Sequence, residues 1–353
     1  MKAFLQICLV LILLVGALTG YYFYDQSQIS TPVNHIHSED IFVVDRGASL
    51  DETLRKLESA GIIKSATTVR IYMKVTGKNL ILKAGDYKFP SPITAVEALK
   101  VLESGGIQQN KLTVIEGWTR FDIADALLKI PSLKLKNKSE ALKLMDDVSL
   151  IKDLDSHVSN LEGYLFPDTY FVQSNTTARQ LIEEMIKRFR EVFGKVVRES
   201  ANPKHLTVHE TVTAASVIET EAKLAVERPV VASVIFNRLK IQMPLAMDST
   251  IVYASKLAGK WKGNGIVYQS DLDLKSLYNT RKYKGLPPGP VGSPGESSLR
   301  AALNPVESNY LYYVREPDRN DGAHNFYANT QGFEAGVAKL RAWEAQQKAR
   351  GLR

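Results

Sequence analysis

The chain has 353 residues, of which 44% are apolar and 24% are charged. This length is enough for one to three domains, and this composition excludes a disordered, collagen-like or coiled-coil chain. The formal net charge of +7 favours anionic partners such as nucleic acid, phospholipid headgroups or an acidic polymer, and the single cysteine, Cys8, excludes internal disulfides and cysteine-based zinc sites.

The amino-terminal segment is predicted to anchor the protein in a membrane. Residues 3–24 form an apolar run, which as a helix would rise about 33 Å and cross a hydrocarbon core of about 30 Å. Lys2 precedes the run and Asp25 follows it, so the positive-inside rule places the first residue in the cytoplasm and the later ones outside. A cleaved signal peptide is the alternative, because Ala-Leu-Thr at 17–19 loosely resembles a cleavage site. Residues 1–24 are therefore expected to be a cytoplasmic stub and a transmembrane anchor.

Residues 25–40 are polar, lack periodicity and are predicted to be a linker. His35 and His37 could belong to a metal site, but no third ligand is near, and a solvated linker is the favoured interpretation. Outside a bacterial inner membrane the large acidic polymer is the cell wall. The basic charge therefore favours a cell-wall partner over nucleic acid.

A weak internal repeat extends over residues 41–130. In 42–49 and again in 112–119, a strand-like apolar run ends at a glycine turn, and Ser49 or Thr119 can cap a following helix. Thr94 begins the same helical spacing a third time. This pattern is similar to the strand-glycine-helix order of LysM glycan-binding modules, and a spacer fold is the alternative.

Residues 131–204 are expected to be a connector and the start of a catalytic domain. The segment 160–170 combines aromatic side chains with carboxylates, which suits sugar binding, but a buried aromatic turn would have the same composition. Residues 176–200 carry apolar side chains on one stripe and Arg and Lys on the other face, so an amphipathic scaffold helix is predicted.

The chemistry is expected in residues 205–345, the predicted catalytic core, which a tail at 346–353 follows. Thr207 and Glu210 have the spacing of a capping box, so a helix should begin near residue 208. A second apolar helix should begin at 227–229, where proline is tolerated in the first turn.

Glu219 and Glu221 end the first of these helices in an apolar context. Burial raises the pKa of a carboxyl group, so that it keeps its proton near neutral pH, as a general acid for glycosidic cleavage requires. The alternative is that either acid forms a structural ion pair with Arg228 or Arg238.

Several ordered blocks of the sequence resemble the YceG-like family of endolytic murein transglycosylases. The central block is Ala-Ala-Ser-Val-Ile-Glu-Thr-Glu at 214–221, and the others are 162–170, 227–228, 231–239, 243–245, 248–250 with Tyr253, 278–280, 285–290 and 324–326. With the anchor and the LysM-like region, the similarity covers nearly the whole chain. We therefore expect an α+β fold with a single transmembrane helix, a small LysM-like α/β subdomain, and a catalytic domain of helices and strands.

The resemblance implies a single-pass inner-membrane protein whose periplasmic part cleaves peptidoglycan glycan strands internally, in contact with wall-synthesis proteins. The family's catalytic glutamate matches Glu219, the first acid of the helix block, and Glu221 would support it. Two turns depart from the family pattern, because Asp-Ser-Thr stands at 248–250 where Asp-Pro-Thr is common, and no glycine pair precedes His324.

Glu219 is expected to act alone, first as an acid and then as a base. It would protonate the oxygen between MurNAc and GlcNAc and then accept the proton of the MurNAc C6 hydroxyl, which attacks C1 and leaves a 1,6-anhydroMurNAc end. No metal or cofactor is needed. The predicted substrate-binding residues are Asp248, Thr250, Tyr278, Asn279, Thr280, Glu221, Pro287 and Pro288. Two other functions compete, a non-catalytic peptidoglycan-binding scaffold for wall-synthesis proteins and a muramidase that uses water.

Overall fold

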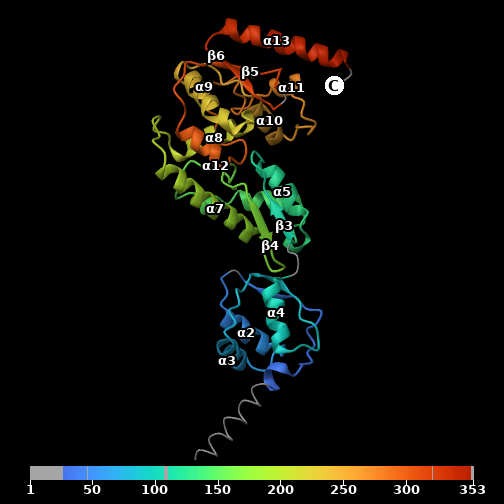
Figure 1. The fold of residues 1–353 in the computed structure, drawn as a ribbon. Helices are drawn as coiled ribbons and strands as arrows, with labels where there is room; N and C mark the ends of the chain where they lie inside the picture. Colours follow the sequence, from blue (N-terminus) through green and yellow to red (C-terminus); the bar gives the residue numbers. More distant parts are fainter. Residues whose placement is uncertain (1–26, 46, 107–109, 320, 351–353) are drawn as a thin grey trace, which may run out of the picture. The chain divides into compact units, whose positions relative to one another are not determined.

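The protein folds into two compact units, which together mix helices and strands (Figure 1). The computed structural model describes residues 27–45, 47–106, 110–319 and 321–350. The N-terminal unit consists of the described residues up to 111 with 171–176, and the C-terminal unit of 112–170 with the described residues from 177 onward. The α+β expectation is confirmed in its mixture of helices and strands. The predicted anchor lies outside the described residues, and within these no helix combines the length and apolar character that a membrane span needs.

In its described residues, the N-terminal unit combines the helices α2, α3 and α4 with a two-stranded antiparallel sheet. Its elements are β1 (Phe42–Val44), α2 (Leu50–Ser59), α3 (Ala66–Thr76), β2 (Gly85–Tyr87) and α4 (Ala95–Ser104). The predicted helix caps are present, since Ser49 accepts from the Glu52 N–H group and Thr94 forms a complete capping box with Glu97.

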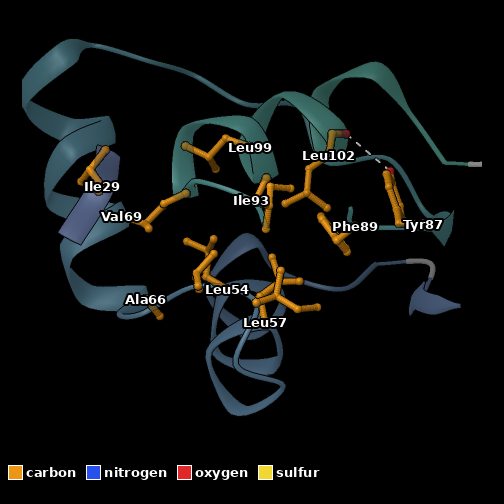
Figure 2. Packing of buried hydrophobic residues seen from close by; sticks show 14 of the residues in the cluster. Ile29, Leu54, Leu57, Ala66, Val69, Tyr87, Phe89, Ile93, Leu99 and Leu102 are labelled. Carbon is orange, nitrogen blue, oxygen red and sulfur yellow. Dashed lines mark hydrogen bonds between the residues drawn. The ribbon is translucent and has the colours of Figure 1, made fainter. Parts of the chain in front are cut away.

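Leucines at helical spacing build the core of this unit (Figure 2). Leu54 and Leu57 come from α2, Leu99 and Leu102 come from α4, and all four are at most 3% exposed. Full burial of one such side chain contributes about 1.5–3 kcal/mol. The spacing of three residues on each helix places both leucines on one face, so the two helices share a single apolar cluster.

Part of the predicted linker at 25–40 belongs to this core. Ile29 is 2% exposed and packs in the same cluster. Val33 and Ile93 exchange two backbone hydrogen bonds, of 2.8 and 3.1 Å. The linker expectation is therefore corrected for Ile29 and Val33, because isolated apolar side chains in a polar segment carry no periodicity that would have predicted the burial of Ile29 or the pairing of Val33 with Ile93.

The repeat predicted over 41–130 does not form one unit. The chain leaves the N-terminal unit after Lys111, so most of the last strand-helix pair, β3 (Asn110–Thr113) and α5 (Arg120–Leu128), belongs to the C-terminal unit. Both copies of the pattern do lead into capped helices. The same strand-glycine-helix pattern therefore occurs in both units, and its copies do not share one hydrophobic core.

The C-terminal unit is mainly helical. Its elements after α5 are the 3-10 helices η1 (Pro131–Leu133), η2 (Val148–Leu150) and η3 (Ala225–Glu227), the helices α6 (Lys138–Met145), α7 (Ala178–Arg198), α8 (Val208–Glu221), α9 (Arg228–Lys240), α10 (Asp248–Leu257), α11 (Gln269–Leu272), α12 (Glu296–Leu303) and α13 (Thr330–Ala349), and the strands β5 (Tyr312–Arg315) and β6 (His324–Tyr327). Strand β4 (Thr169–Val172) begins in this unit and ends in the N-terminal unit. Strand β3 pairs with β4, and β5 pairs antiparallel with β6. Helix α7 is the predicted amphipathic helix, capped by Thr177 and buried along its apolar stripe.

The aromatic segment 160–170 is a buried turn. Tyr164, Phe166 and Tyr170 are at most 6% exposed, and the Tyr164 hydroxyl donates to the carboxylate of Asp155. Gly163 has a φ of +84°, and a Cβ atom there would lie 2.4 Å from Pro290, so only glycine fits. Buried rings cannot stack on a sugar, and the aromatic-turn alternative is therefore confirmed.

Glu162 belongs to this turn, and its buried carboxyl group contacts the start of α5. We predict that Glu162 makes the stability of the protein depend on pH. Burial raises the pKa of Glu162 to about 7 from 4.5, although the Arg120 N–H group donates to both carboxylate oxygens. The folded state then binds more protons than the unfolded state between these two pH values, so the free energy of unfolding should fall as pH rises through this window.

Replacement of Glu162 by Gln keeps an acceptor for Arg120 and removes the titration. At about 1.4 kcal/mol for each pKa unit, the pH-dependent difference between wild type and variant should be on the order of 3 kcal/mol in denaturant titrations. The matched control is Glu307→Gln, which changes an exposed acid of the same unit. An equal pH dependence of the Glu162→Gln variant and the wild type would contradict the prediction.

Candidate active site at the end of helix α8

Helix α8 carries the two candidate acids in its last turn. The predicted capping box is present, because Thr207 and Glu210 exchange bonds at the first turn. Residues 211–218 are all buried, and α8 packs against α9, α10 and α12 (Figure 1). Glu219 and Glu221 are two positions apart, which is about 200° around the helix axis. They therefore meet different neighbours.

Glu219 lies in an ion pair with Arg228, the first residue of α9. The Arg228 Nη2 atom donates to Glu219 Oε1 at 2.6 Å, and the Gly295 N–H group donates to Oε2 at 2.9 Å. The Glu219 side chain is 4% exposed. Burial raises the pKa of Glu219, and the Gly295 N–H group and the charge of Arg228 oppose that rise. The ion pair with Arg228 is the alternative that the sequence left open.

Two glycines let the chain close around Glu219. Gly295 precedes α12, and a Cβ atom there would lie 1.9 Å from Oε1 of Glu116. Gly117 has a φ of +81° and donates its N–H group to the Ser293 carbonyl at 2.8 Å. Glu116 itself accepts from the Arg228 Nη2 atom at 3.3 Å. Arg228 therefore stands between two carboxylates, of which only Glu219 is buried.

Glu221 is held by two neutral hydroxyl groups. Ser249 Oγ donates to Glu221 Oε1 at 2.9 Å, and Tyr313 Oη donates to Oε2 at 2.8 Å. Burial raises the pKa of Glu221, the Tyr313 and Ser249 hydroxyls oppose the rise, and the charge of Asp248 adds to it. A carboxyl in these surroundings can hold its proton without leaving a guanidinium unpaired.

Tyr313 links Glu221 to a second buried pair. Its ring lies edge-on to the His324 ring, with centroids 5.2 Å apart. His324 in turn contacts Glu227 through its N–H group and Nδ1, both at 2.9 Å. Sequence reasoning missed Tyr313 and Gly295, since no motif marks them and their partners lie 92 and 76 positions away. Ser249 and His324 stand in family blocks, but no role was expected for them.

Three of the predicted substrate-binding residues are buried and have internal hydrogen-bond partners. Thr250, Asn279 and Thr280 are at most 1% exposed. The hydroxyls of Thr250 and Thr280 lie 2.8 Å apart, and the Asn279 amide donates to two backbone carbonyls. The hydrogen bond between Thr250 and Thr280 connects the start of α10 to the loop that follows α11, and the Asn279 bonds hold this loop to the end of α11. Substrate contact by these three residues stays a prediction, and in this structure their polar groups are occupied by internal partners.

Asp248, Tyr278 and Pro288 are more accessible, whereas Pro287 is buried. Asp248 is 58% exposed in its side chain and pairs with Arg281 at 2.7 Å. The Tyr278 ring packs 4.8 Å from that of Tyr253, and burial raises the pKa of Tyr278 to about 12. Pro287 and Pro288 line a cavity of about 360 Å³ near the start of α8.

The predicted linker histidines have protein partners. His37 Nδ1 lies 2.7 Å from Asp40, and His35 Nε2 lies 3.0 Å from the Pro90 carbonyl oxygen. In the part of the chain that the structure describes, no three His, Cys, Asp or Glu side chains come together as a metal site would need.

Comparison with known proteins places these features in a family. The profile described as the YceG-like family matches residues 42–339. A Bacillus subtilis protein named "Endolytic murein transglycosylase" is 34% identical over 283 residues, which cover 76% of each chain. A Streptococcus pneumoniae protein of the same name is 31% identical over 94% of this chain, and the match spans 63% of that relative's length.

A solved structure agrees with the sequence matches. The crystal structure of a YceG-like protein from Listeria monocytogenes superposes with a TM-score of 0.57 and 32% identity, over 84% of this chain and 99% of that one. The chain therefore belongs to the YceG-like family.

Proposed function

We propose that this protein is a lytic transglycosylase that cleaves the MurNAc–GlcNAc bond within peptidoglycan strands and leaves a 1,6-anhydroMurNAc end. The two bacterial relatives named endolytic murein transglycosylase support the substrate and the reaction. The observation that carries the proposal is the end of α8, where an apolar helix presents two buried carboxyl groups in different surroundings. Such a pair suits a reaction that needs one protonated acid.

We further propose that the protein is a single-pass inner-membrane protein with its catalytic part in the periplasm. The apolar run of residues 3–24, with Lys2 before it and Asp25 after it, supports this placement. Peptidoglycan would then be within reach of the C-terminal unit. Glycan binding by the LysM-like residues of the N-terminal unit and contact with wall-synthesis proteins belong to the same proposal.

The contacts of Glu221 suit a general acid better than those of Glu219 do. We therefore propose Glu221 for the role that the family resemblance implied for Glu219. A proton on Glu219 would remove the buried negative charge that Arg228 faces at 2.6 Å and would leave the guanidinium with the exposed Glu116 alone, and loss of the buried partner of a buried ion is costly. A proton on Glu221 leaves only hydroxyl partners, which can reverse their donor and acceptor roles. Glu219 would serve with Arg228 to hold α8, α9 and α12 together.

The reaction needs no second carboxylate. Protonated Glu221 gives its proton to the bridging oxygen while the bond from that oxygen to C1 of MurNAc breaks. The carboxylate that forms accepts the proton of the C6 hydroxyl, whose oxygen bonds to C1. No water is consumed, and the attack is favoured because nucleophile and electrophile belong to one sugar. A buried acid fits this cycle, since it starts protonated and its conjugate base is a strong acceptor.

The matched variants Glu221→Gln and Glu219→Gln test the assignment. We expect Glu221→Gln to lower the rate of glycan cleavage by at least about 100-fold, the size of a lost general acid, with little change in thermal stability. Glu219→Gln should mainly lower the melting temperature, because it leaves Arg228 with the exposed Glu116 alone. Loss of cleavage in a stable Glu219→Gln variant, with activity kept in Glu221→Gln, would return the role to Glu219.

Tyr313→Phe should change the pH dependence of cleavage. The Tyr313 hydroxyl lowers the pKa of Glu221, so its removal should raise that pKa further. The acid must be protonated to act, and the high-pH limb of kcat/KM should therefore move to higher pH. Tyr310→Phe is the control, since Tyr310 packs on Phe326 outside the contacts of Glu221. A shift to lower pH, or an equal shift in both variants, would argue against Glu221.

Product analysis separates the competing functions. Digestion of isolated peptidoglycan by the full chain, followed by mass spectrometry, should yield anhydro ends that are lighter than reducing ends by one water molecule. Reducing ends would instead indicate a muramidase. No cleavage by folded protein would favour the non-catalytic scaffold.

A further inference from the structure

A second candidate site lies at the opposite end of α8 from the two acids. A cavity of about 360 Å³ is lined by His209, Glu210 and Thr213 of α8, by Leu239 of α9, and by the loop residues Leu286, Pro287 and Pro288. This volume is within the usual range of ligand pockets, about 300–1,000 Å³. The walls are apolar, and the polar groups all come from one helix.

Thr213 is the observation that points to a ligand. It is 1% exposed and lines the cavity. Among the described residues, no hydrogen-bond partner is found for its Oγ1 atom. Buried hydroxyls are nearly always hydrogen-bonded. Other hydroxyls of this helix follow the rule, since Ser216 donates to the Thr213 carbonyl at 2.8 Å and Thr211 donates to the Thr207 carbonyl at 2.7 Å. A ligand in the cavity would supply the missing partner.

The wall of the cavity is held in place from behind. His209 Nδ1 lies 2.8 Å from a carboxylate oxygen of Asp155, and His209 Nε2 lies 2.8 Å from the Pro288 carbonyl oxygen. Asp155 is buried, with its side chain 1% exposed, and also accepts from the Tyr164 hydroxyl. The proline loop is thereby tied to α8. A pocket that is already ordered binds without the cost of ordering its walls.

The charge in the cavity is negative. The Thr207 backbone N–H and hydroxyl groups both donate to Glu210 Oε2 and hold the pKa of that carboxyl below its usual range. Glu210 is therefore ionised at neutral pH. Lys240 follows Leu239 in the chain but lines another cavity together with Lys204. An exposed acid, an apolar wall and a buried hydroxyl suit a cation on a short aliphatic chain.

We propose that this cavity binds a primary alkylammonium group, the chemistry of a lysine-type diamino acid side chain. The methylenes would pack on Leu239, Leu286 and the two prolines. The ammonium would donate to Glu210 and to the Thr213 hydroxyl. If the proposed function holds, on which this last step rests, the diamino acid would belong to a peptide stem of the substrate.

The test is a titration of the full chain with two small probes, followed by saturation-transfer difference NMR. Nα-acetyl-L-lysine amide carries the ammonium, and Nα,Nε-diacetyl-L-lysine amide has the same chain without the charge. We expect saturable binding of the first probe and at least about tenfold weaker binding of the second, as the loss of a hydrogen bond between charged groups predicts. Equal affinity for the two probes, or no saturable binding of the first, would overturn the proposal.

Variants localise the binding. Glu210→Gln keeps the capping box, in which Gln replaces Glu, and should weaken the charged probe by about tenfold or more. Thr213→Val keeps the shape of the side chain and should weaken it as well. Glu307→Gln, an exposed acid outside this cavity, is the control and should bind as the wild type does. Wild-type affinity in folded Glu210→Gln would overturn the site.

The readout is binding and not cleavage, so the two proposals fail separately. A failed titration with an active enzyme would reject the cavity and keep the proposed function. Probe binding by a protein that cleaves no glycan would keep the cavity and reject its assignment to a peptide stem.

Discussion

The burial of residues 211–218 in α8 is the constraint on which the candidate site depends. Residues 211–218 are covered on every face of the helix, so the helix cannot rotate to exchange its neighbours. Small side chains permit this close packing, and the Ser216 hydroxyl accepts from the backbone of Val291 at 3.0 Å. The directions of Glu219 and Glu221 follow from the packing of the two turns before them. Their different surroundings are thus a property of the fold and not of local sequence.

Those surroundings give different properties to two glutamates that lie only two positions apart in the sequence. Both are desolvated, and desolvation raises the pKa of each. Glu219 receives a backbone N–H group and a guanidinium, which stabilise a charge, whereas Glu221 receives two hydroxyls, which serve either protonation state. The arrangement resembles other active sites in which environment divides roles between paired acids. In this protein the division is made by residues from α9, α10, α12 and β5.

Local patterns in the sequence were sufficient to predict α7, α8 and α9, whereas α10 and α12 were not predicted. The capping box at Thr207, the stripe of α7 and the proline at the start of α9 each depend on a few neighbouring residues. The unit boundary at Lys111 was not predictable in this way, because the repeat looks the same on both sides of it. Nor was the burial of Thr250 and Thr280, whose mutual hydrogen bond joins positions 30 residues apart. A polar residue in a family block carries no signal that distinguishes a binding role from a structural one.

Helix α8 also sets the distance between the two candidate sites. Thr213 and Glu221 are eight residues apart, so at about 1.5 Å per residue they are separated by about 12 Å along the axis. A sugar at Glu221 cannot itself fill the cavity at Thr213, whereas a flexible chain attached to that sugar can reach it. Contacts so far from the reacting bond accelerate the chemistry only if they hold the sugar in a reactive position. If they hold the substrate equally before and during the reaction, their loss raises KM and leaves kcat unchanged. The rigid helix between the sites favours the first case, because it allows little slack between a bound ammonium and the acid.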